Sequence, residues 1–259
     1  MTKAQPKPQN EKNPEREWFG ERHVSPEEKT GLVHDVFASV ADSYDVMNDF
    51  MSAGVHRLWK DRLVRMIRPR SDQVFLDVAG GTGDIAFRIR AKAGPDTAIT
   101  VCDINPEMLR VGRDRAINRG WMDDFDWVTG NAECLPIPDA SVDVYTIAFG
   151  LRNVTHIDRA LADAYRVLKP GGRFYCMEFS RVTEPMLRRI YDAYSYSVIP
   201  KIGEIVAKDR DSYQYLVESI RKFPPQRELE TRMRAAGFDR ARHTNLSFGI
   251  AAIHEGWKY

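Results

Sequence analysis

Residues 77–84, Asp-Val-Ala-Gly-Gly-Thr-Gly-Asp, place three glycines between two carboxylates. The apolar residues before this stretch predict a short buried strand, and the residues after it can continue as a helix. Gly81 and Gly83 permit a tight turn and leave no Cβ in the way of a ligand. The start of a helix also offers unpaired backbone N–H groups. A strand, a glycine turn and a helix in this order predict a ligand site at the carboxyl end of a parallel strand.

The same stretch limits which ligand fits. Gly81, Gly83 and Ala86 match the glycine pattern of dinucleotide sites, and Asp103 follows at about the expected spacing, so NAD is one candidate. However, the carboxylates of Asp77 and Asp84 would repel a pyrophosphate unless a cation lay between them. S-adenosylmethionine carries a cationic amino acid end, a sulfonium and a ribose that Asp103 can bind through both hydroxyls. The charge pattern therefore favours this methyl donor over a dinucleotide, and both over a turn that only connects two elements.

Polar residues also follow the next three expected strands. Asn131, Arg152 and Asn153 are expected at strand ends on the same side of the sheet as Asp77 and Asp103. Asn131 can bind a ligand, although an Asn at this position can equally form a turn. Arg152 can stabilise a phenolate in an aromatic acceptor, or it can form a structural ion pair with a nearby Asp.

The elements that position these residues alternate along the chain. Strands are expected at 73–77, 98–103, 126–129, 142–149 and 173–179, and the Lys-Pro-Gly-Gly at 169–172 ends the helix before the last of them. Strands that alternate with helices predict a doubly wound, mostly parallel α/β sheet. A helix at 226–236 and a closing antiparallel pair at 238–243 and 247–256 would bring the sheet to seven strands.

Two further segments flank this sheet. Residues 1–24 are expected to be a disordered tail, because the first part is polar and rich in Pro, Lys and Glu. A helical segment from 27 to 44 follows and ends at Tyr44. Residues 185–225 predict a helical insertion, or lid, after the fifth strand. We therefore expect one domain over residues 25–259.

Composition excludes several classes of protein. The chain has 259 residues, 43% of them hydrophobic, and a net charge of +1, which gives no electrostatic reason to expect nucleic acid. Its three cysteines are scattered, which predicts neither a disulfide framework nor a metal site and fits a cytoplasmic protein. No apolar run is long enough to span a bilayer.

Longer motifs add a family resemblance to these patterns. The glycine loop, Asp103 and Lys-Pro-Gly-Gly resemble class I S-adenosylmethionine-dependent methyltransferases, which have a Rossmann-like fold. More specific motifs, from about Glu28 to the C-terminus, resemble the ubiquinone/menaquinone biosynthesis C-methyltransferase family. These motifs are Phe-Ala-Ser-Val-Ala (37–41), Tyr-Asp-Val-Met-Asn (44–48), Gly-Val-His-Arg-Leu-Trp-Lys (54–60), Phe-Gly-Leu-Arg-Asn-Val (149–154), Tyr-Asp-Ala-Tyr-Ser (191–195) and Asp-Ser-Tyr-Gln-Tyr-Leu (211–216).

The resemblance implies C-methylation of a prenylated quinol, either 2-methoxy-6-polyprenyl-1,4-benzoquinol or demethylmenaquinol or both. It implies cofactor contacts at Thr82, Asp103, Asn131 and Ala132. The family commonly has Ser where this chain has Ala148, so position 148 is left out of the site.

Arg152, Asn153 and Tyr44 match motif positions, and we expect them to be the catalytic residues. The insertion can enclose the prenyl tail and make a peripheral contact with the inner face of the membrane, or with a quinone-biosynthesis complex. Two alternatives stay open at this point: an NAD-dependent oxidoreductase and a non-catalytic partner that binds the cofactor or quinone.

Overall fold

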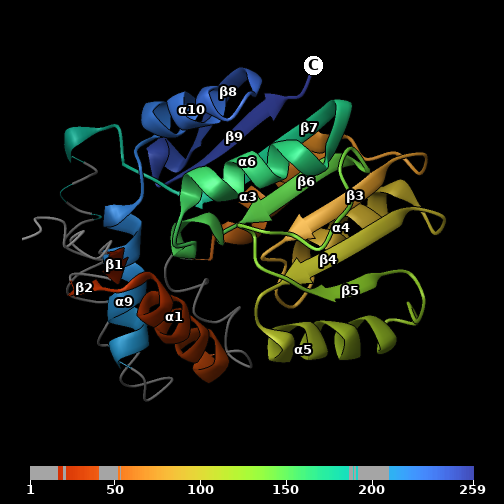
Figure 1. The fold of residues 1–259 in the computed structure, drawn as a ribbon, viewed down its shortest axis with the longest axis horizontal. Helices are drawn as coiled ribbons and strands as arrows, with labels where there is room; N and C mark the ends of the chain where they lie inside the picture. Colours follow the sequence, from red (N-terminus) through yellow and green to blue (C-terminus); the bar gives the residue numbers. More distant parts are fainter. Residues whose placement is uncertain are drawn as a thin grey trace, which may run out of the picture.

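The computed structural model describes residues 17–19, 22–40, 52, 54–186, 189, 191 and 210–259. A seven-stranded sheet forms the centre of this described part (Figure 1). Its strand order is β5-β4-β3-β6-β7-β9-β8, and only β8 and β9 introduce antiparallel pairing. The predicted doubly wound fold is therefore confirmed. The strands are β3 (Val74–Val78), β4 (Ala98–Asp103), β5 (Asp126–Thr129), β6 (Val142–Ala148), β7 (Leu168–Phe179), β8 (Asp239–Leu246) and β9 (Ala251–Trp257).

Helices cover both faces of the sheet because successive strand residues point to opposite sides. On β6, Val144 packs into one apolar cluster while Tyr145 and Ile147 pack into the other. The first cluster includes side chains of α3 (His56–Ile67), α4 (Asp84–Ala93) and α5 (Pro106–Ile117). The second includes side chains of α6 (Ile157–Val167) and α10 (Gln226–Ala235).

Local signals explain where the helix next to the site begins. Asn105 accepts hydrogen bonds from the backbone N–H groups of Glu107 (2.9 Å) and Met108 (3.3 Å), and Pro106 occupies the first turn. This is a side-chain cap followed by proline, a combination that is typical of helix starts. The cap fixes the loop between β4 and α5, and with it the position of Asp103.

One predicted turn lies within a strand. The Lys-Pro-Gly-Gly at 169–172 ends α6 as expected, but it also belongs to β7. Backbone hydrogen bonds from Gly171 N to Lys258 O (2.6 Å) and from Lys258 N to Gly172 O (3.0 Å) extend the sheet across it. A partner almost ninety residues later in the chain therefore decides its conformation.

The closing pair is antiparallel as predicted, but its second strand begins later than expected. A short 3-10 turn, η4 (Ser247–Gly249), separates β8 from β9. Within it Phe248 has left-handed backbone angles (φ 58°, ψ 27°), which differ from the extended angles of regular strands.

The N-terminal region differs from the predicted tail. β1 (Glu17–Phe19) and β2 (Arg22–Val24) pair as a small antiparallel sheet, and Phe19 and Val24 are buried. The aromatic ring of Phe19 stacks on Tyr215 of α9 (Arg210–Lys222), which supplies the apolar partner that this segment lacks locally.

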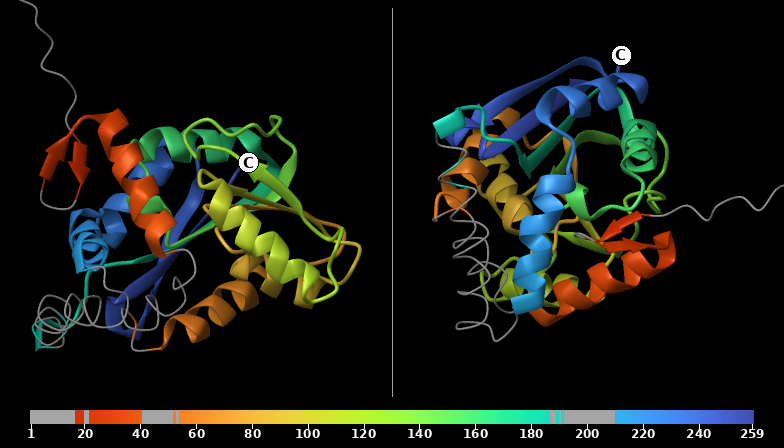
Figure 2. Two further views of the ribbon diagram at one scale, coloured as in Figure 1. Left: turned by 90° about the horizontal axis from the view of Figure 1, so that it is seen from below. Right: turned by 90° about the vertical axis from the view of Figure 1, so that its left-hand side faces the viewer.

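The helix after this small sheet is α1 (Pro26–Val40), and the predicted 41–44 extension lies outside the described residues, as does most of the 185–225 insertion. The arrowheads of β3, β4 and β6 point toward the side of the molecule where α1, α9 and the β1–β2 pair lie (Figure 1). Two further views show the same grouping (Figure 2). These segments therefore face the carboxyl ends of the parallel strands, where a ligand is expected.

Candidate active site

A pocket opens where β3 and β6 lie side by side at the centre of the sheet. The chain leaves β3 toward β4 and leaves β6 toward β7, so the two following loops diverge. Such a switch point is the usual ligand site of doubly wound sheets. The loops after β3, β4, β5 and β6 line the pocket, together with Thr30 and Val33 of α1 and Lys60 of α3.

The glycine loop adopts the conformation that its sequence predicts. Gly81 and Gly83 have positive φ angles of 53° and 82°, and Gly83 is the residue before α4. Gly150, after β6, approaches the same loop so closely that an added Cβ would lie 2.3 Å from the Cβ of Ala79. Glycine at 150 therefore allows the two loops of the switch point to meet.

Asp103 holds the glycine loop and lines the pocket. One carboxylate oxygen accepts the backbone N–H of Gly81 at 2.8 Å, and the other accepts that of Asn105 at 2.9 Å. Burial raises the pKa of Asp103, and these backbone N–H groups act in the opposite direction. Each oxygen keeps a second lone pair, so the predicted binding of two ribose hydroxyls fits this geometry.

Asp77 is a buried carboxylate with an incomplete set of partners. Its Oδ1 accepts a hydrogen bond from the Thr146 hydroxyl (2.7 Å), while its Oδ2 has no hydrogen-bond partner among the described residues. Burial raises the pKa of Asp77 to about 7, and the negative charges of Asp84 and Asp103 act in the same direction. A cationic group in the pocket would compensate this carboxylate, which fits the amino acid end of S-adenosylmethionine.

Asp84 does not contribute the free negative charge that the sequence suggested. Its carboxylate contacts Lys60 Nζ at 2.7 Å and Arg88 Nε at 3.1 Å. Burial would raise the pKa of Asp84, but these two cations outweigh burial and lower it. The electrostatic preference for a cationic ligand therefore depends on Asp77 and Asp103. Lys60 also lines the pocket, although the sequence predicts no role for it in the site.

Thr82 lies on the pocket wall as predicted. Its hydroxyl accepts a hydrogen bond from Arg115 Nη1 of α5 at 2.9 Å. The hydroxyl hydrogen remains a possible donor to a ligand, because accepting one bond does not use it.

Asn131 and Ala132 lie on the loop after β5 and line the pocket. The Asn131 side chain accepts the backbone N–H of Glu133 at 2.9 Å, so it also forms the turn that was its alternative role. Glu133 in turn accepts the backbone N–H of His156 at 3.0 Å and joins this loop to the start of α6. Both predicted residues thus reach the pocket, and Asn131 shapes the loop that carries them.

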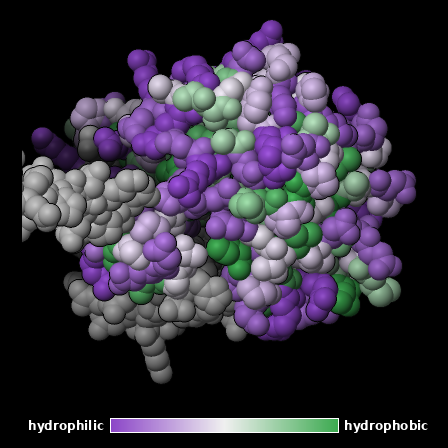
Figure 3. All heavy atoms as spheres, viewed as in Figure 1, coloured by the Kyte–Doolittle hydropathy of each residue, from purple (hydrophilic) through white to green (hydrophobic). Residues whose placement is uncertain are grey.

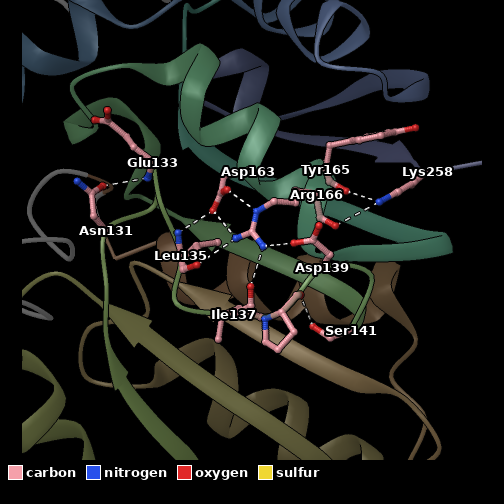
Figure 4. Close-up of polar contacts among 11 residues, drawn as sticks. Asn131, Glu133, Leu135, Ile137, Asp139, Ser141, Asp163, Tyr165, Arg166 and Lys258 are labelled. Carbon is pink, nitrogen blue, oxygen red and sulfur yellow. Dashed lines mark hydrogen bonds and ion pairs between the residues drawn. The ribbon is translucent and has the colours of Figure 1, made fainter.

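Arg166 of α6 fixes the remainder of that loop (Figure 4). Its guanidinium donates to the carbonyls of Leu135 (3.0 Å) and Ile137 (2.8 Å) and contacts Asp139 (2.5 Å) and Asp163 (2.7 Å). Asp163 also accepts the backbone N–H of Leu135 at 2.7 Å. No sequence pattern predicts this role, because an Arg on an amphipathic helix is usually solvent-exposed.

Arg152 and Asn153 occupy the short turn η2 (Leu151–Asn153) after β6 but point to different surroundings. Asn153 lines the pocket. The Arg152 side chain has an exposed fraction of 0% and lies 2.7 Å from Glu178 Oε1 and 2.7 Å from the carbonyl of Phe149. Arg152 therefore forms a structural ion pair, which was the alternative to stabilising a phenolate. Its partner is Glu178 of β7 and not the expected Asp.

Tyr44, the third predicted catalytic residue, lies outside the described residues. Ala148, where the resembled family commonly has Ser, lines the pocket with a methyl group. In the part of the chain that the structure describes, His, Cys, Asp and Glu form no cluster suited to a metal ion.

Comparison with known proteins gives this pocket a context. Residues 23–258 match the model of the ubiE/COQ5 methyltransferase family. A protein from Brucella abortus, the ubiquinone/menaquinone biosynthesis C-methyltransferase UbiE, is 56% identical over 93% of this chain and 90% of its own length.

Solved structures show the same fold at low sequence identity. A possible histamine N-methyltransferase from Thermotoga maritima, described as S-adenosylmethionine-dependent, has a TM-score of 0.60 and 21% identity, covering 88% of this chain and all of its own. Phosphoethanolamine N-methyltransferase 2 of Haemonchus contortus, solved with S-adenosylmethionine, has a TM-score of 0.57 and 13% identity, covering 77% of this chain and 52% of its own.

Replacing Asp77 by Asn should strengthen the fold and weaken cofactor binding. The folded-state pKa of Asp77 is about 7 and exceeds the usual value of 3.8, so wild-type stability falls as pH rises toward and through 7. We expect Asp77→Asn to melt at a higher temperature than wild type at pH 8 without ligand, with a smaller difference at pH 5. Calorimetric titration should show weaker binding of S-adenosylmethionine. Asp96→Asn, at an exposed position outside the pocket lining, is the control, and unchanged cofactor affinity in Asp77→Asn would contradict the assigned role.

Replacing Arg166 by Ala should loosen the loop that carries Asn131 and Ala132. The carbonyls of Leu135 and Ile137 lose a charged donor, so we expect a lower melting temperature and a severalfold weaker affinity for S-adenosylmethionine, measured by titration. Arg70→Ala is the matched control, since Arg70 is exposed and pairs with Asp72 away from the residues that line the pocket. Equal affinities in wild type and Arg166→Ala would show that the loop does not need this clamp.

Proposed function

The chain belongs to the ubiE/COQ5 methyltransferase family, and from this premise we propose that it methylates a ring carbon of a prenylated quinol with S-adenosylmethionine as donor. The match over residues 23–258 carries this proposal, and the pocket geometry supports it. This family match also favours a methyltransferase over the two alternatives, an NAD-dependent oxidoreductase and a non-catalytic partner. The acceptors considered are 2-methoxy-6-polyprenyl-1,4-benzoquinol and demethylmenaquinol.

The cofactor half of the proposed site consists of the loops after β3, β4 and β5. S-adenosylmethionine supplies an electrophilic methyl group on its sulfonium when it is bound. Asp77 attracts the cationic amino acid end, Asp103 accepts hydrogen bonds from the ribose, and Asn131 and Ala132 border the base. Gly81 and Thr82 line the pocket, whereas Gly83, also a predicted cofactor residue, is not among the lining residues and precedes α4 with its Cα facing Phe87 and Trp127. These roles fit the lining of the pocket and the partners described above.

The acceptor half lies where α1 meets the turn after β6. Lys29 Nζ donates to the carbonyl of Val154 at 3.2 Å, and the hydroxyls of Thr30 and Thr155 are 3.3 Å apart. These contacts hold α1 across the pocket, where Thr30 and Val33 face the ligand space and limit the access of water. An acceptor ring between α1 and Asn153 would lie next to the cofactor half.

Asn153 is the proposed contact to the ring hydroxyl of the acceptor. A quinol becomes a stronger carbon nucleophile as it loses a hydroxyl proton, and a side-chain N–H can stabilise the developing phenolate. Arg152, buried against Glu178, is proposed to position this turn instead of touching the acceptor. Tyr44 remains a predicted catalytic residue, and residues 25–259 remain a proposed single domain with the 185–225 segment over the acceptor.

Peripheral contact with a membrane is a further part of the proposal. No helix in the described part of the chain is long and apolar enough to cross a bilayer. The face in Figure 3 is mostly hydrophilic, with apolar atoms in small groups. Phe248 is 70% exposed and Met186 is 74% exposed. The backbone N–H of Thr183, three residues before Met186, donates to the carbonyl of Phe248 at 2.9 Å and brings the two loops together. We propose that these loops insert apolar side chains between lipid headgroups.

The direct test of function is anaerobic methyl transfer from labelled S-adenosylmethionine in detergent. The acceptors are the reduced methoxy-prenyl-benzoquinone and reduced demethylmenaquinone, and we expect label on a ring carbon of at least one. Label on both would indicate an enzyme that recognises the quinol ring and the tail. Asn153→Ala should bind the cofactor as wild type does and turn over much more slowly. Cofactor binding without transfer to either acceptor would contradict the proposal.

The membrane contact can be tested with vesicles that contain anionic phospholipids. Wild type should float with the vesicles in a density gradient, and Phe248→Ser and Met186→Ser should reduce the bound fraction. Met122→Ser is the matched control, because Met122 is 73% exposed and belongs to a different loop. An equal loss in all three variants, or no flotation of wild type, would argue against these loops as the contact.

A further inference from the structure

The side-chain amide of Asn153 is held in one orientation by two partners of opposite kind. Its Nδ2 lies 3.4 Å from the carbonyl oxygen of Phe149, and its Oδ1 lies 3.1 Å from the hydroxyl of Tyr215. A carbonyl oxygen can only accept, so the nitrogen must face Phe149. The amide oxygen then faces Tyr215, whose hydroxyl must donate. One N–H of Asn153 is left for a ligand in the pocket that this residue lines.

Tyr215 is well placed to fix this orientation. It belongs to α9, it is buried, and its ring stacks on Phe19 of β1 with 4.2 Å between ring centroids and 15° between ring planes. Burial raises the pKa of Tyr215 well above its usual value, so the hydroxyl stays protonated and remains a donor at any working pH. The stacked ring leaves the hydroxyl little freedom to turn away from Asn153.

We propose that Tyr215 is a positioning residue for methyl transfer, which orients Asn153 as a hydrogen-bond donor to the oxygen of the acceptor ring. Without the Tyr215 hydroxyl, the amide oxygen of Asn153 would lose its partner, and the amide could rotate and present its oxygen to the acceptor. An amide oxygen facing a phenolate repels it. Phe19 supports the arrangement from the N-terminal strand. This inference rests on the proposed function.

The variant Tyr215→Phe separates the hydroxyl from the ring. The stack on Phe19 is kept, and only the hydrogen bond to Asn153 is lost. We expect kcat for the quinol to fall about tenfold, as for the loss of one orienting hydrogen bond, with the KM for S-adenosylmethionine unchanged. Tyr175→Phe is the matched control, because Tyr175 is also buried and its hydroxyl contacts Arg173 outside the pocket. It should leave kcat as in wild type.

A double-mutant cycle with Asn153→Ala distinguishes positioning from a general structural role. Once the amide is gone, Tyr215→Phe should cause no further loss of kcat. If it lowers kcat by the same factor in both backgrounds, Tyr215 does not act through Asn153 and the proposal is overturned.

A spectroscopic readout does not depend on turnover. In protein labelled with ¹⁵N at asparagine, the side-chain amide signals of Asn153 are those that disappear in Asn153→Ala. These signals should shift and broaden in Tyr215→Phe and stay in place in Tyr175→Phe. Unchanged signals in Tyr215→Phe would overturn the proposal even in an active enzyme. Absence of methyl transfer by wild type with the shift still present would instead count against the proposed function alone.

Discussion

The buried ion pair between Arg152 and Glu178 is the interaction on which the proposed acceptor side of the pocket depends. Glu178 accepts Arg152 Nη1 at 2.7 Å and the backbone N–H groups of Arg152 (3.3 Å) and Phe179 (2.9 Å), so it ties the turn after β6 to the end of β7. Arg152 also binds the carbonyl of Phe149, which has a positive φ of 57°. Loss of one partner of a buried pair typically costs about 3–5 kcal/mol. The ion pair therefore stabilises the unusual backbone conformation just before Asn153.

The cofactor side depends on the opposite situation, a charge that the protein leaves uncompensated. Asp77 lies at the end of a central strand with one carboxylate oxygen unpaired, while the neighbouring Asp84 is neutralised by Lys60 and Arg88. An unpaired buried carboxylate lowers stability, and a cationic ligand restores the balance. Under the proposed assignment, the ligand-free protein tolerates an unfavourable charge at Asp77, and this charge favours a cationic cofactor.

Sequence patterns predicted the elements that carry the proposed cofactor half, because the determinants of these elements are local. The strand at 98–103 and the glycine turn are each defined by neighbouring residues, and the structure has both where they are expected. Contacts between distant segments escaped prediction. Nothing near Arg152 in the sequence identifies Glu178 as its partner. Nothing near residues 17–19 shows that Phe19 has an aromatic partner in α9, so the local sequence predicts a tail there.

The proposed acceptor half is built from contacts between segments that are distant in the sequence. Asn153 comes from the turn after β6, its hydrogen-bond donor Tyr215 from α9, and the ring that holds Tyr215 from β1. Lys29 of α1 completes the enclosure through the carbonyl of Val154. Three of these four contributions come from outside the alternating strands and helices of the central sheet. In the proposed site, a common methyl donor is bound by the sheet loops, while the N-terminal segments and α9, which lies between β7 and α10, shape the space for the acceptor. Because Tyr215 and Phe19 act on Asn153 from those segments, acceptor recognition depends on contacts that form only when the whole domain is folded.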